Sequence, residues 1–233
     1  MRRQRTLFLT LTDHNTIAGA LEIAPLPRTF ISEEVSCLLP GGRELHVGVF
    51  DITEAQHEAI ARRRRDAEAF FAYLAEERIP AAVNHLFSAL TGRRQTADLH
   101  HALANVTLVE ARNGMMSEAV NDCAARAGRA ARKGAVGGSD AHTLASVAGA
   151  YTVVPGARTR DDFLDGLRRG LTLPAGRSGG YARLTADVAR IAAGAYASAA
   201  TGCARGHDRA FGARGHHACG GPLGRPASAG MAS

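Results

Sequence analysis

The feature that most constrains the fold is a short apolar segment that leads directly into two metal-competent side chains. Residues 6–11 are rich in Thr, Leu and Phe and predict a strand. Asp13 and His14 follow it, and a helix pattern over 17–23 comes next. A strand that ends in polar ligands and turns into a helix is how α/β barrels place a functional site at the C-terminal ends of their strands.

Strand and helix patterns alternate along the rest of the chain. The turn at residues 40–42 separates two strand patterns, 28–37 and 44–50, and predicts a β-hairpin. Further strands are expected at 79–85, 106–110, 135–139 and 151–154, and helices at 53–74, 96–103, 117–132, 159–170 and 184–197. This order predicts an α/β fold with a largely parallel sheet.

The helix that starts at Thr53 has the clearest pattern. Thr53 and Gln56 form a capping box. Apolar side chains recur at helical spacing and predict its buried face: Ile60, Ala67, Phe70, Phe71 and Leu74. The basic run 62–65 falls mostly on the other face, where a solvated surface is favoured over a nucleic-acid patch.

Charge and cysteine usage narrow the class of protein. The chain has 233 residues and a net charge of +6, yet residues 6–200 carry 21 basic and 21 acidic side chains, so nucleic-acid binding is not indicated. The four cysteines show no CxxC spacing and are expected to be reduced thiols: Cys37, Cys123, Cys203 and Cys219. No signal peptide or membrane-spanning segment is apparent, so we expect a soluble cytoplasmic protein.

The composition changes at residue 201. Residues 201–233 are Gly, Ala, Arg, His and Pro with few large apolar side chains, which predicts a disordered low-complexity tail after a domain at 1–200. The tail contains His207, His216, His217 and Cys219, but their spacing matches no standard zinc site.

Histidine and acidic residues recur at the ends of the expected strands. They are Asp13, His14, Glu34, His46, His85, Asp140 and His142. Mixed imidazole and carboxylate ligands suit zinc, manganese and iron. More than four such ligands allow two ions, which can clamp a phosphoryl group and activate a water molecule. The sequence therefore predicts a metal centre.

The motifs that carry these residues resemble the PHP (polymerase and histidinol phosphatase) family of metal-dependent phosphoesterases. They are Thr12-Asp13-His14-Asn15-Thr16, Ser32-Glu33-Glu34-Val35-Ser36, Glu44-Leu45-His46-Val47-Gly48, Val83-Asn84-His85 and Gly138-Ser139-Asp140-Ala141-His142. The resemblance covers about residues 6–180. It implies a distorted seven-stranded β/α barrel, two or three divalent metal ions, and hydrolysis of phosphate monoesters or diesters.

The resemblance also implies roles for single residues. It assigns metal binding to His14, Glu34, His46, His85, Asp140 and His142, with Glu34 as the bridging carboxylate. Strand alternation would point Glu33 away from the site. Asp13 would orient the turn or bind a metal, and Arg112 would meet a phosphate or pair with Glu110 or another acid.

The sequence departs from the family pattern at two places. Leu86 follows His85 where many members have proline. The family's first motif, a His-x-His pair on the first strand, has no counterpart before Asp13, so we expect a barrel that lacks its first strand and helix. His57, His100 and His101 fall inside expected helices and should face solvent.

Three functions are compatible with these expectations. The first is hydrolysis of a small phosphorylated substrate at a centre of manganese, zinc or iron. The second is a truncated and inactive remnant, in which the six remaining ligands hold fewer ions. The third is a non-catalytic metal-binding module, although the low aromatic content of 5% argues against single-stranded nucleic acid as its partner.

Overall fold

The structure is a computed structural model that describes residues 7–88, 95–180, 185–186, 189–190 and 193. Contacts divide the chain into one unit at 1–190 and another at 191–233, and the description below concerns the first unit. The expected tail at 201–233 and most of the expected helix at 184–197 lie outside the described residues. The domain division at residue 200 therefore stays a prediction.

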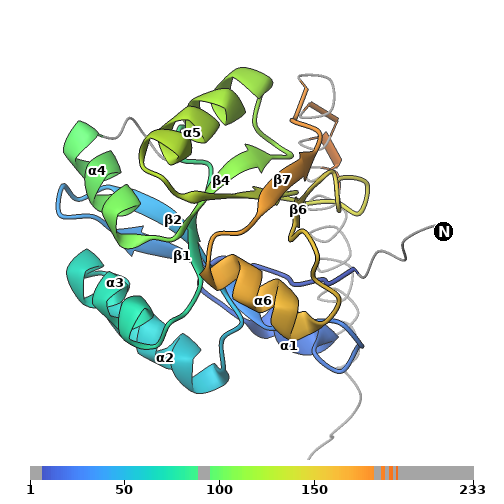
Figure 1. The fold of residues 1–233 in the computed structure, drawn as a ribbon, viewed down its shortest axis with the longest axis horizontal. Coiled ribbons are helices and arrows are strands. Elements are labelled where there is room, and N and C mark those ends of the chain that lie inside the picture. The colour runs from blue at the N-terminus through green and yellow to red at the C-terminus, as the bar shows by residue number, and fades with distance from the viewer. Residues whose placement is uncertain (1–6, 89–94, 181–184, 187–188, 191–192, 194–233) are drawn as a thin grey trace, which may run out of the picture. The chain divides into compact units, whose positions relative to one another are not determined.

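Five strands form one sheet, in the order β1-β2-β3-β4-β5 (Figure 1). Their bounds are β1 Ser32–Leu38, β2 Glu44–Phe50, β3 Ala81–Val83, β4 Leu108–Asn113 and β5 Gly134–Gly138. The pairs β1–β2 and β2–β3 are antiparallel, and the pairs β3–β4 and β4–β5 are parallel. A separate antiparallel pair consists of β6 Ala150–Val153 and β7 Leu173–Gly176.

Six helices accompany these strands in the described part of the chain. They are α1 Ala18–Ile23, α2 Glu54–Arg63, α3 Ala67–Glu76, α4 Thr96–Asn105, α5 Glu118–Ala130 and α6 Arg160–Arg168. The expected capping box of α2 is present, because the Thr53 side chain accepts the Gln56 N–H and the Gln56 side chain accepts the Thr53 N–H. Thr159 and Asp162 form the equivalent box at the start of α6.

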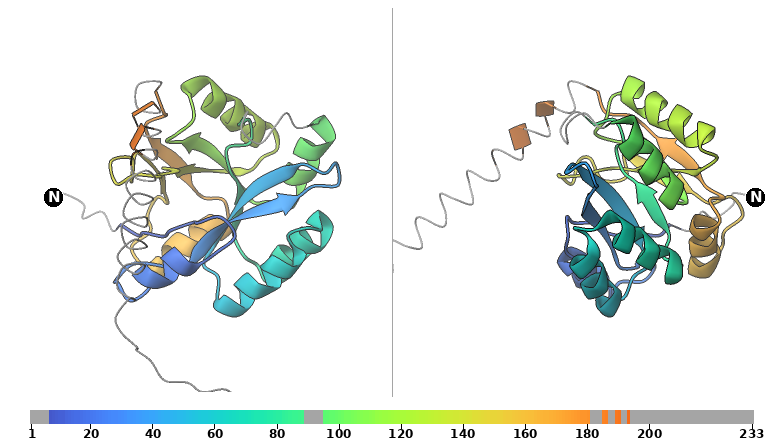
Figure 2. Two further views of the ribbon diagram at one scale, coloured as in Figure 1. Left: turned by 180° about the vertical axis from the view of Figure 1, so that it is seen from behind. Right: turned by 90° about the vertical axis from the view of Figure 1, so that its left-hand side faces the viewer.

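The outer face of the sheet packs against α2 and α3. Successive side chains of a strand point to opposite faces, so Val35, Val47 and Val83 share this face. They belong to a fully buried cluster that also includes the predicted helix residues Ile60, Ala67, Phe70, Phe71 and Leu74. Helices α2 to α5 lie around this side of the sheet in Figures 1 and 2.

The inner face has an apolar half that is covered by α6. Ala82, Leu108 and Val136 lie on neighbouring strands and pack with Leu164 and Leu167 of α6. The remaining half of the same face carries polar side chains, which form the candidate site described below. We call the apolar half, formed by Ala82, Leu108 and Val136, the apolar floor.

An ion-pair cluster attaches α6 to the end of β2. The Asp51 carboxylate accepts hydrogen bonds from Arg160 and from Arg168, the latter at 2.9 Å. Asp51 has a left-handed φ of 59° and directly follows β2. This cluster joins residues that are 109 and 117 positions apart in the sequence.

The sheet differs from the largely parallel sheet that the strand and helix order predicts. The turn after β1, with Gly42 at a φ of 75°, reverses the chain and makes β1 and β2 antiparallel. Among the described residues neither sheet closes on itself, so a closed barrel is not shown. The structure is a mixed α/β fold with a parallel part at β3–β5.

Two expected elements also differ, and one strand was not expected. Residues 7–16 make isolated bridges at Leu9 and His14 in place of a strand, and the exposed fractions of Leu7 and Leu9 are 72% and 47%. The expected helix 53–74 is two helices, because Asp66 leaves the helical conformation and caps α3 by accepting the Ala69 N–H at 3.1 Å. The strand β7 was not predicted.

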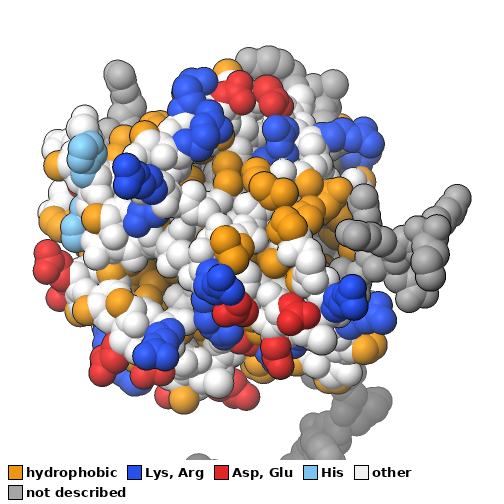
Figure 3. All heavy atoms as spheres, viewed as in Figure 1, with side chains coloured by type: hydrophobic (Ala, Val, Ile, Leu, Met, Phe, Trp, Pro, Cys, Tyr) orange, Lys and Arg blue, Asp and Glu red, His pale blue; other side chains and the backbone are white. Residues whose placement is uncertain are grey.

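Large apolar side chains are exposed on and beside the β6–β7 pair. Figure 3 shows hydrophobic side chains gathered on this face of the molecule. The exposed large side chains of these strands and their flank are Tyr151, Val153, Leu171 and Leu173. Within the described ranges, no helix has the length and apolar character needed to span a membrane.

We predict that shortening Leu164 on α6 destabilises the domain. Leu164 is 2% exposed, and Leu164→Ala would leave a cavity between α6 and the sheet, which costs about 2–5 kcal/mol. Leu144→Ala is the matched control, because Leu144 is 95% exposed and should change the free energy of unfolding little. Urea denaturation measures both variants, and equal stabilities would show that α6 does not pack on the inner face.

Candidate metal centre

A short turn fastens His14 beside β1. The Glu34 N–H donates to the Asp13 carbonyl at 3.1 Å, and the Asn15 N–H donates to the Glu34 carbonyl at 2.8 Å. Asn15 has a left-handed φ of 56°, which asparagine tolerates better than most residues, and its side chain bonds both the N–H and the hydroxyl of Ser36. The turn therefore holds His14 next to Glu34 without a regular strand.

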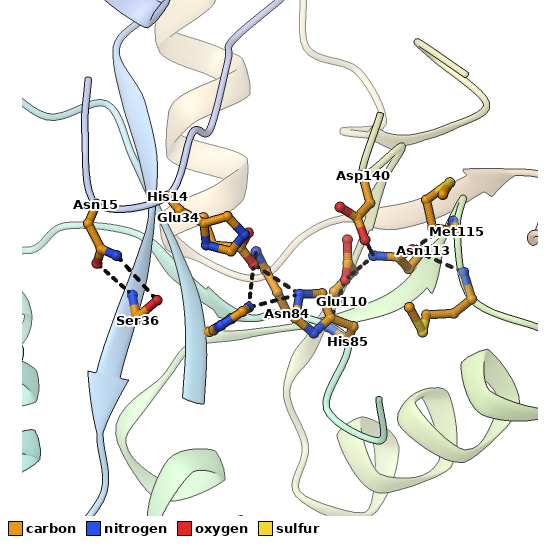
Figure 4. Close-up of polar contacts among 12 residues, drawn as sticks. His14, Asn15, Glu34, Ser36, Asn84, His85, Glu110, Asn113, Met115 and Asp140 are labelled. Carbon is orange, nitrogen blue, oxygen red and sulfur yellow. Dashed lines mark hydrogen bonds and ion pairs between the residues drawn. The ribbon is translucent and has the colours of Figure 1, made fainter. Parts of the chain in front are cut away.

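Glu34 lies at the centre of three imidazoles (Figure 4). Its Oε2 is 3.3 Å from His14 Nε2, and its Oε1 is 3.0 Å from His85 Nε2 and 3.5 Å from His46 Nδ1. The Asn84 amide donates to Oε1 at 2.9 Å. The structure thus brings together four of the predicted ligands, which come from the first turn, β1, β2 and the end of β3.

The pairing of β1 and β2 explains this convergence. Glu34 is opposite Gly48, and Ser36 is opposite His46, so Glu34 and His46 lie diagonally on one face. A Cβ on Gly48 would come within 3.1 Å of the Asn84 side chain. Glycine at this position therefore leaves room for Asn84 to reach Glu34.

The spacing of the ligand atoms fits a divalent ion. His46 Nδ1 and His85 Nε2 are 3.3 Å apart, and each is 3.0–3.5 Å from Glu34 Oε1. Ligand atoms on one tetrahedral zinc ion lie about 3.4 Å apart, given bonds of about 2.0–2.1 Å. A second overlapping set, His14, Glu34 and His46, offers ligand atoms within 4.8 Å of one another. The donor set present therefore suits the metals that the resemblance implies.

The electrostatics of Glu34 and His85 follow from their contact. Burial alone would raise the pKa of Glu34, but the His85 hydrogen bond and charge, together with Asn84 and His46, lower it to about 2. Burial would lower the pKa of His85, but Glu34, Glu110 and Asp140 raise it above its usual value. The contact thus favours the ionised form of Glu34 and the protonated form of His85.

A line of hydrogen bonds continues from His85 to Asp140. The His85 N–H donates to Glu110 Oε2 at 2.8 Å, and the Asn113 amide donates both to Glu110 Oε2 at 2.9 Å and to Asp140 Oδ2 at 3.1 Å. These residues follow or lie in β3, β4 and β5, whose parallel strands end at one edge of the sheet. Asp140 is therefore linked to the centre through Asn113 and Glu110.

His142 lies at the outer limit of the site. Its Nδ1 is 3.0 Å from the Asp140 carbonyl oxygen and 3.8 Å from Asp140 Oδ1, and its side chain is 52% exposed. Asp140 itself has a left-handed φ of 48°. The structure thus keeps the predicted pair Asp140 and His142 together, with His142 open to solvent.

A β-bulge in β4 determines which side chains face the site. The pairing with β5 shifts between Glu110 and Arg112, so that Asn113 is opposite Gly138. Regular alternation from Glu110 would turn Arg112 inward and Asn113 outward, and the extra residue reverses this. Asn113 consequently faces Glu110 on the inner face.

The bulge also settles the position of Arg112. Its guanidinium pairs with Glu118 of α5 at 3.4 Å and donates to the Ser178 hydroxyl at 3.1 Å. Of the two alternatives for Arg112, the structure has the ion pair with an acid, and that acid is Glu118 instead of Glu110. A phosphate contact by Arg112 stays a prediction.

Asp13 orients the turn through its backbone. Its carbonyl accepts the Glu34 N–H, while its carboxylate lies where a Cβ on Gly19 of α1 would be. The structure therefore places the Asp13 side chain against α1, beside the turn that carries His14.

Glu110 was not among the predicted site residues. It is 5% exposed, and burial raises its pKa to about 7, although the His85 charge and the bonds from Asn113 and the His85 N–H oppose this. The signal was available in the sequence, because Glu110 is a carboxylate in an otherwise apolar strand pattern at 106–110. Such a residue needs buried partners.

Two of the three helix histidines do not face solvent as expected. His57 Nδ1 is 3.0 Å from Glu33 Oε1 on the outer face, which confirms that Glu33 points away from the site. The ring of His101 packs edge-on against Phe71 with centroids 5.8 Å apart. Both rings point inward because α2 packs against the buried Glu33 and α4 packs against the buried Phe71. His100 is exposed, as predicted.

Comparison with known proteins supports the resemblance that the motifs carry. Residues 119–172 match the family model PHP_C, described as PHP-associated. This stretch runs from α5 to the segment before β7 and includes Asp140 and His142. No curated protein matches the sequence of this chain.

Two solved structures match this chain in the comparison of structures. One is a two-domain protein from Bacteroides vulgatus ATCC 8482 that contains a predicted PHP-like metal-dependent phosphoesterase, with a TM-score of 0.52, 13% identity, and coverage of 72% of this chain and 55% of that chain. The other is PsfC from Pseudomonas syringae PB-5123, with a TM-score of 0.48, 20% identity, and coverage of 64% and 59%. This chain spans less than two thirds of either protein. The family-model match supports the resemblance to the PHP family over residues 119–172, and the Bacteroides protein is similar in fold.

Proposed function

We propose that this chain is a metal-dependent phosphoesterase that hydrolyses a phosphate monoester or diester. The observation that carries the proposal is the position of Glu34, whose two carboxylate oxygens face different imidazoles. Oε1 faces His46 and His85, and Oε2 faces His14. A carboxylate in this position can serve two neighbouring ions, as the resemblance implies for Glu34.

The residues divide into ligands and supports. We assign His46, His85 and Glu34 Oε1 to one ion, and His14 with Glu34 Oε2 to a second. Asp140 and His142 lie at the end of the same edge and would add ligands from β5. When bound, manganese, zinc or iron ions polarise the phosphoryl oxygens and lower the pKa of a bound water molecule.

The chain's own groups prepare this site before a metal binds. Asn84 fixes the orientation of the Glu34 carboxylate by donating to Oε1, which leaves Oε2 toward His14. The apolar floor of Ala82, Leu108 and Val136 limits the access of water from below. The balanced charge of residues 6–200 favours a small phosphorylated substrate over a nucleic acid. The closed barrel of the family and a cytoplasmic location remain proposals.

A non-catalytic metal-binding module is the second candidate. The observation that favours it is the position of Arg112, whose guanidinium pairs with Glu118 and donates to Ser178, so that its charge is already partnered by a carboxylate. Both candidates, and a catalytically inactive remnant that retains these ligands, predict metal binding. Only the first predicts turnover, so the two properties need separate measurement.

We predict that Glu34→Gln reduces both metal content and phosphatase activity. The amide keeps the shape of the side chain but removes the charge that neutralises a divalent ion, so loss of most of the bound metal is expected. Elemental analysis of the purified protein and hydrolysis of an aryl phosphate in manganese or zinc measure the two effects.

Glu33→Gln is the matched control for this experiment. Glu33 is the adjacent residue of β1 and is also buried, but it points to the opposite face and pairs with His57. It should keep the metal and the activity of the parent. Equal losses in the two variants would contradict the proposed site, and metal binding without turnover in the parent would favour the non-catalytic module.

We predict that the affinity for a divalent metal rises with pH through the neutral range. Glu34 raises the pKa of His85 above its usual value of about 6.5, so the metal-free protein holds a proton there that binding must release. Calorimetric titration with manganese between about pH 5.5 and about pH 8 should show tighter binding and less proton release as His85 deprotonates. An affinity that does not change with pH would exclude His85 as a ligand.

A further inference from the structure

Glu110 occupies a position between two of the proposed ligands without being assigned as one. It lies on β4, and its Oε2 accepts two hydrogen bonds, from the His85 N–H at 2.8 Å and from the Asn113 amide at 2.9 Å. Its side chain lies on the inner face, because Glu110 is opposite Val136 in the sheet, and its carboxylate contacts the polar groups of His85 and Asn113. One carboxylate oxygen thus joins the ends of β3 and β4.

His85 depends on this contact for its backbone conformation. Its φ is 28°, a left-handed value that is costly for a residue other than glycine, so surrounding contacts must hold it. Its Nδ1 is buried without a hydrogen-bond partner among the described residues. The orientation of the His85 ring therefore depends largely on two contacts, the hydrogen bond from its N–H to Glu110 and the contact of its Nε2 with Glu34.

Asp140 is reached through the same oxygen. The Asn113 amide that donates to Glu110 Oε2 also donates to Asp140 Oδ2 at 3.1 Å. Asn113 can do this only because the bulge in β4 turns it toward Glu110. Asp140 also has a left-handed φ, so both residues that Glu110 supports have strained backbones.

The neighbouring strand leaves space for the Glu110 carboxylate. A Cβ added to Gly138 of β5 would lie 2.5 Å from Glu110 Oε1, closer than such atoms approach in real structures. Gly138 stands two residues before Asp140. The packing at this point therefore accommodates a carboxylate between the strand ends that deliver His85 and Asp140.

We propose that Glu110 is a positioning residue of the metal centre, which fixes His85 directly and Asp140 through Asn113 by accepting hydrogen bonds at Oε2. This role rests on the proposed function, because it concerns ligands of that site. It makes the buried acid of β4 necessary for metal affinity although it need not touch the metal. Supporting groups of this kind typically change metal affinity by about 10- to 100-fold when they are removed.

The test compares Glu110→Ala, Glu110→Gln and the control Asp98→Ala. Glutamine keeps an acceptor oxygen for both donors, whereas alanine removes it. Asp98 is likewise a buried carboxylate, 7% exposed, that accepts a backbone N–H and pairs with Arg43, but it lies outside the site. Manganese affinity measured by calorimetry should fall about 10- to 100-fold in Glu110→Ala and stay near the parent value in the other two.

Three results would overturn the proposal. Parent-like manganese affinity in Glu110→Ala would show that the contact is dispensable. Equal loss in Glu110→Gln and Glu110→Ala would show that the charge matters in place of the hydrogen bonds. A similar loss in Asp98→Ala would reduce the effect to general destabilisation and would also reject the positioning role.

A second measurement separates this proposal from the proposed function. If the parent binds no manganese, the metal site itself fails, and crystal structures of the metal-free parent and variants then decide the role of Glu110. The 3.0 Å contact between Glu34 Oε1 and His85 Nε2 should persist in Glu110→Gln and be lost in Glu110→Ala. Its persistence in Glu110→Ala would reject the proposal.

Discussion

The contact between the Glu34 carboxylate and the surrounding imidazoles is the interaction on which the rest of the site depends. A buried charge is costly unless it is paired and hydrogen-bonded, and Glu34 meets that condition through His85 and Asn84. These partners come from the end of β3, while His46 comes from β2. A slip of one residue in the pairing of β1 would turn Glu33 inward and Glu34 toward α2. The register of β1 therefore determines whether Glu34 can take part in the metal centre.

Much of the centre could be predicted because its residues obey local rules. The β-hairpin, both threonine caps and the inner orientation of Glu34 relative to Glu33 follow from turn residues, capping boxes and strand alternation. His85 and Asp140 could be placed at strand ends for the same reason. Convergence of His14, Glu34, His46 and His85 on one point then follows from the sheet, and the structure shows it.

The features that were missed depend on contacts between distant segments. The bulge in β4 exists only relative to β5, so the sequence of β4 alone could not show that Asn113 faces inward and Arg112 outward. His57 of α2 is turned inward because it contacts Glu33, which lies on β1. Asp66 caps α3 and so divides one long helical pattern into two helices. The apolar run at 6–11 predicted a strand, but the residues beside it offered no surface on which Leu7 or Leu9 could be buried.

The Asp51 cluster has a consequence for the order in which the molecule assembles. The ligands His14, Glu34, His46 and His85 lie within one continuous quarter to third of the chain, so the hairpin and β3 can bring them together early through contacts of modest sequence separation. The floor beneath them is complete only when α6 docks, through Asp51, across more than a hundred residues. During synthesis, these four ligands therefore emerge well before α6, the helix that completes the apolar part of the same face.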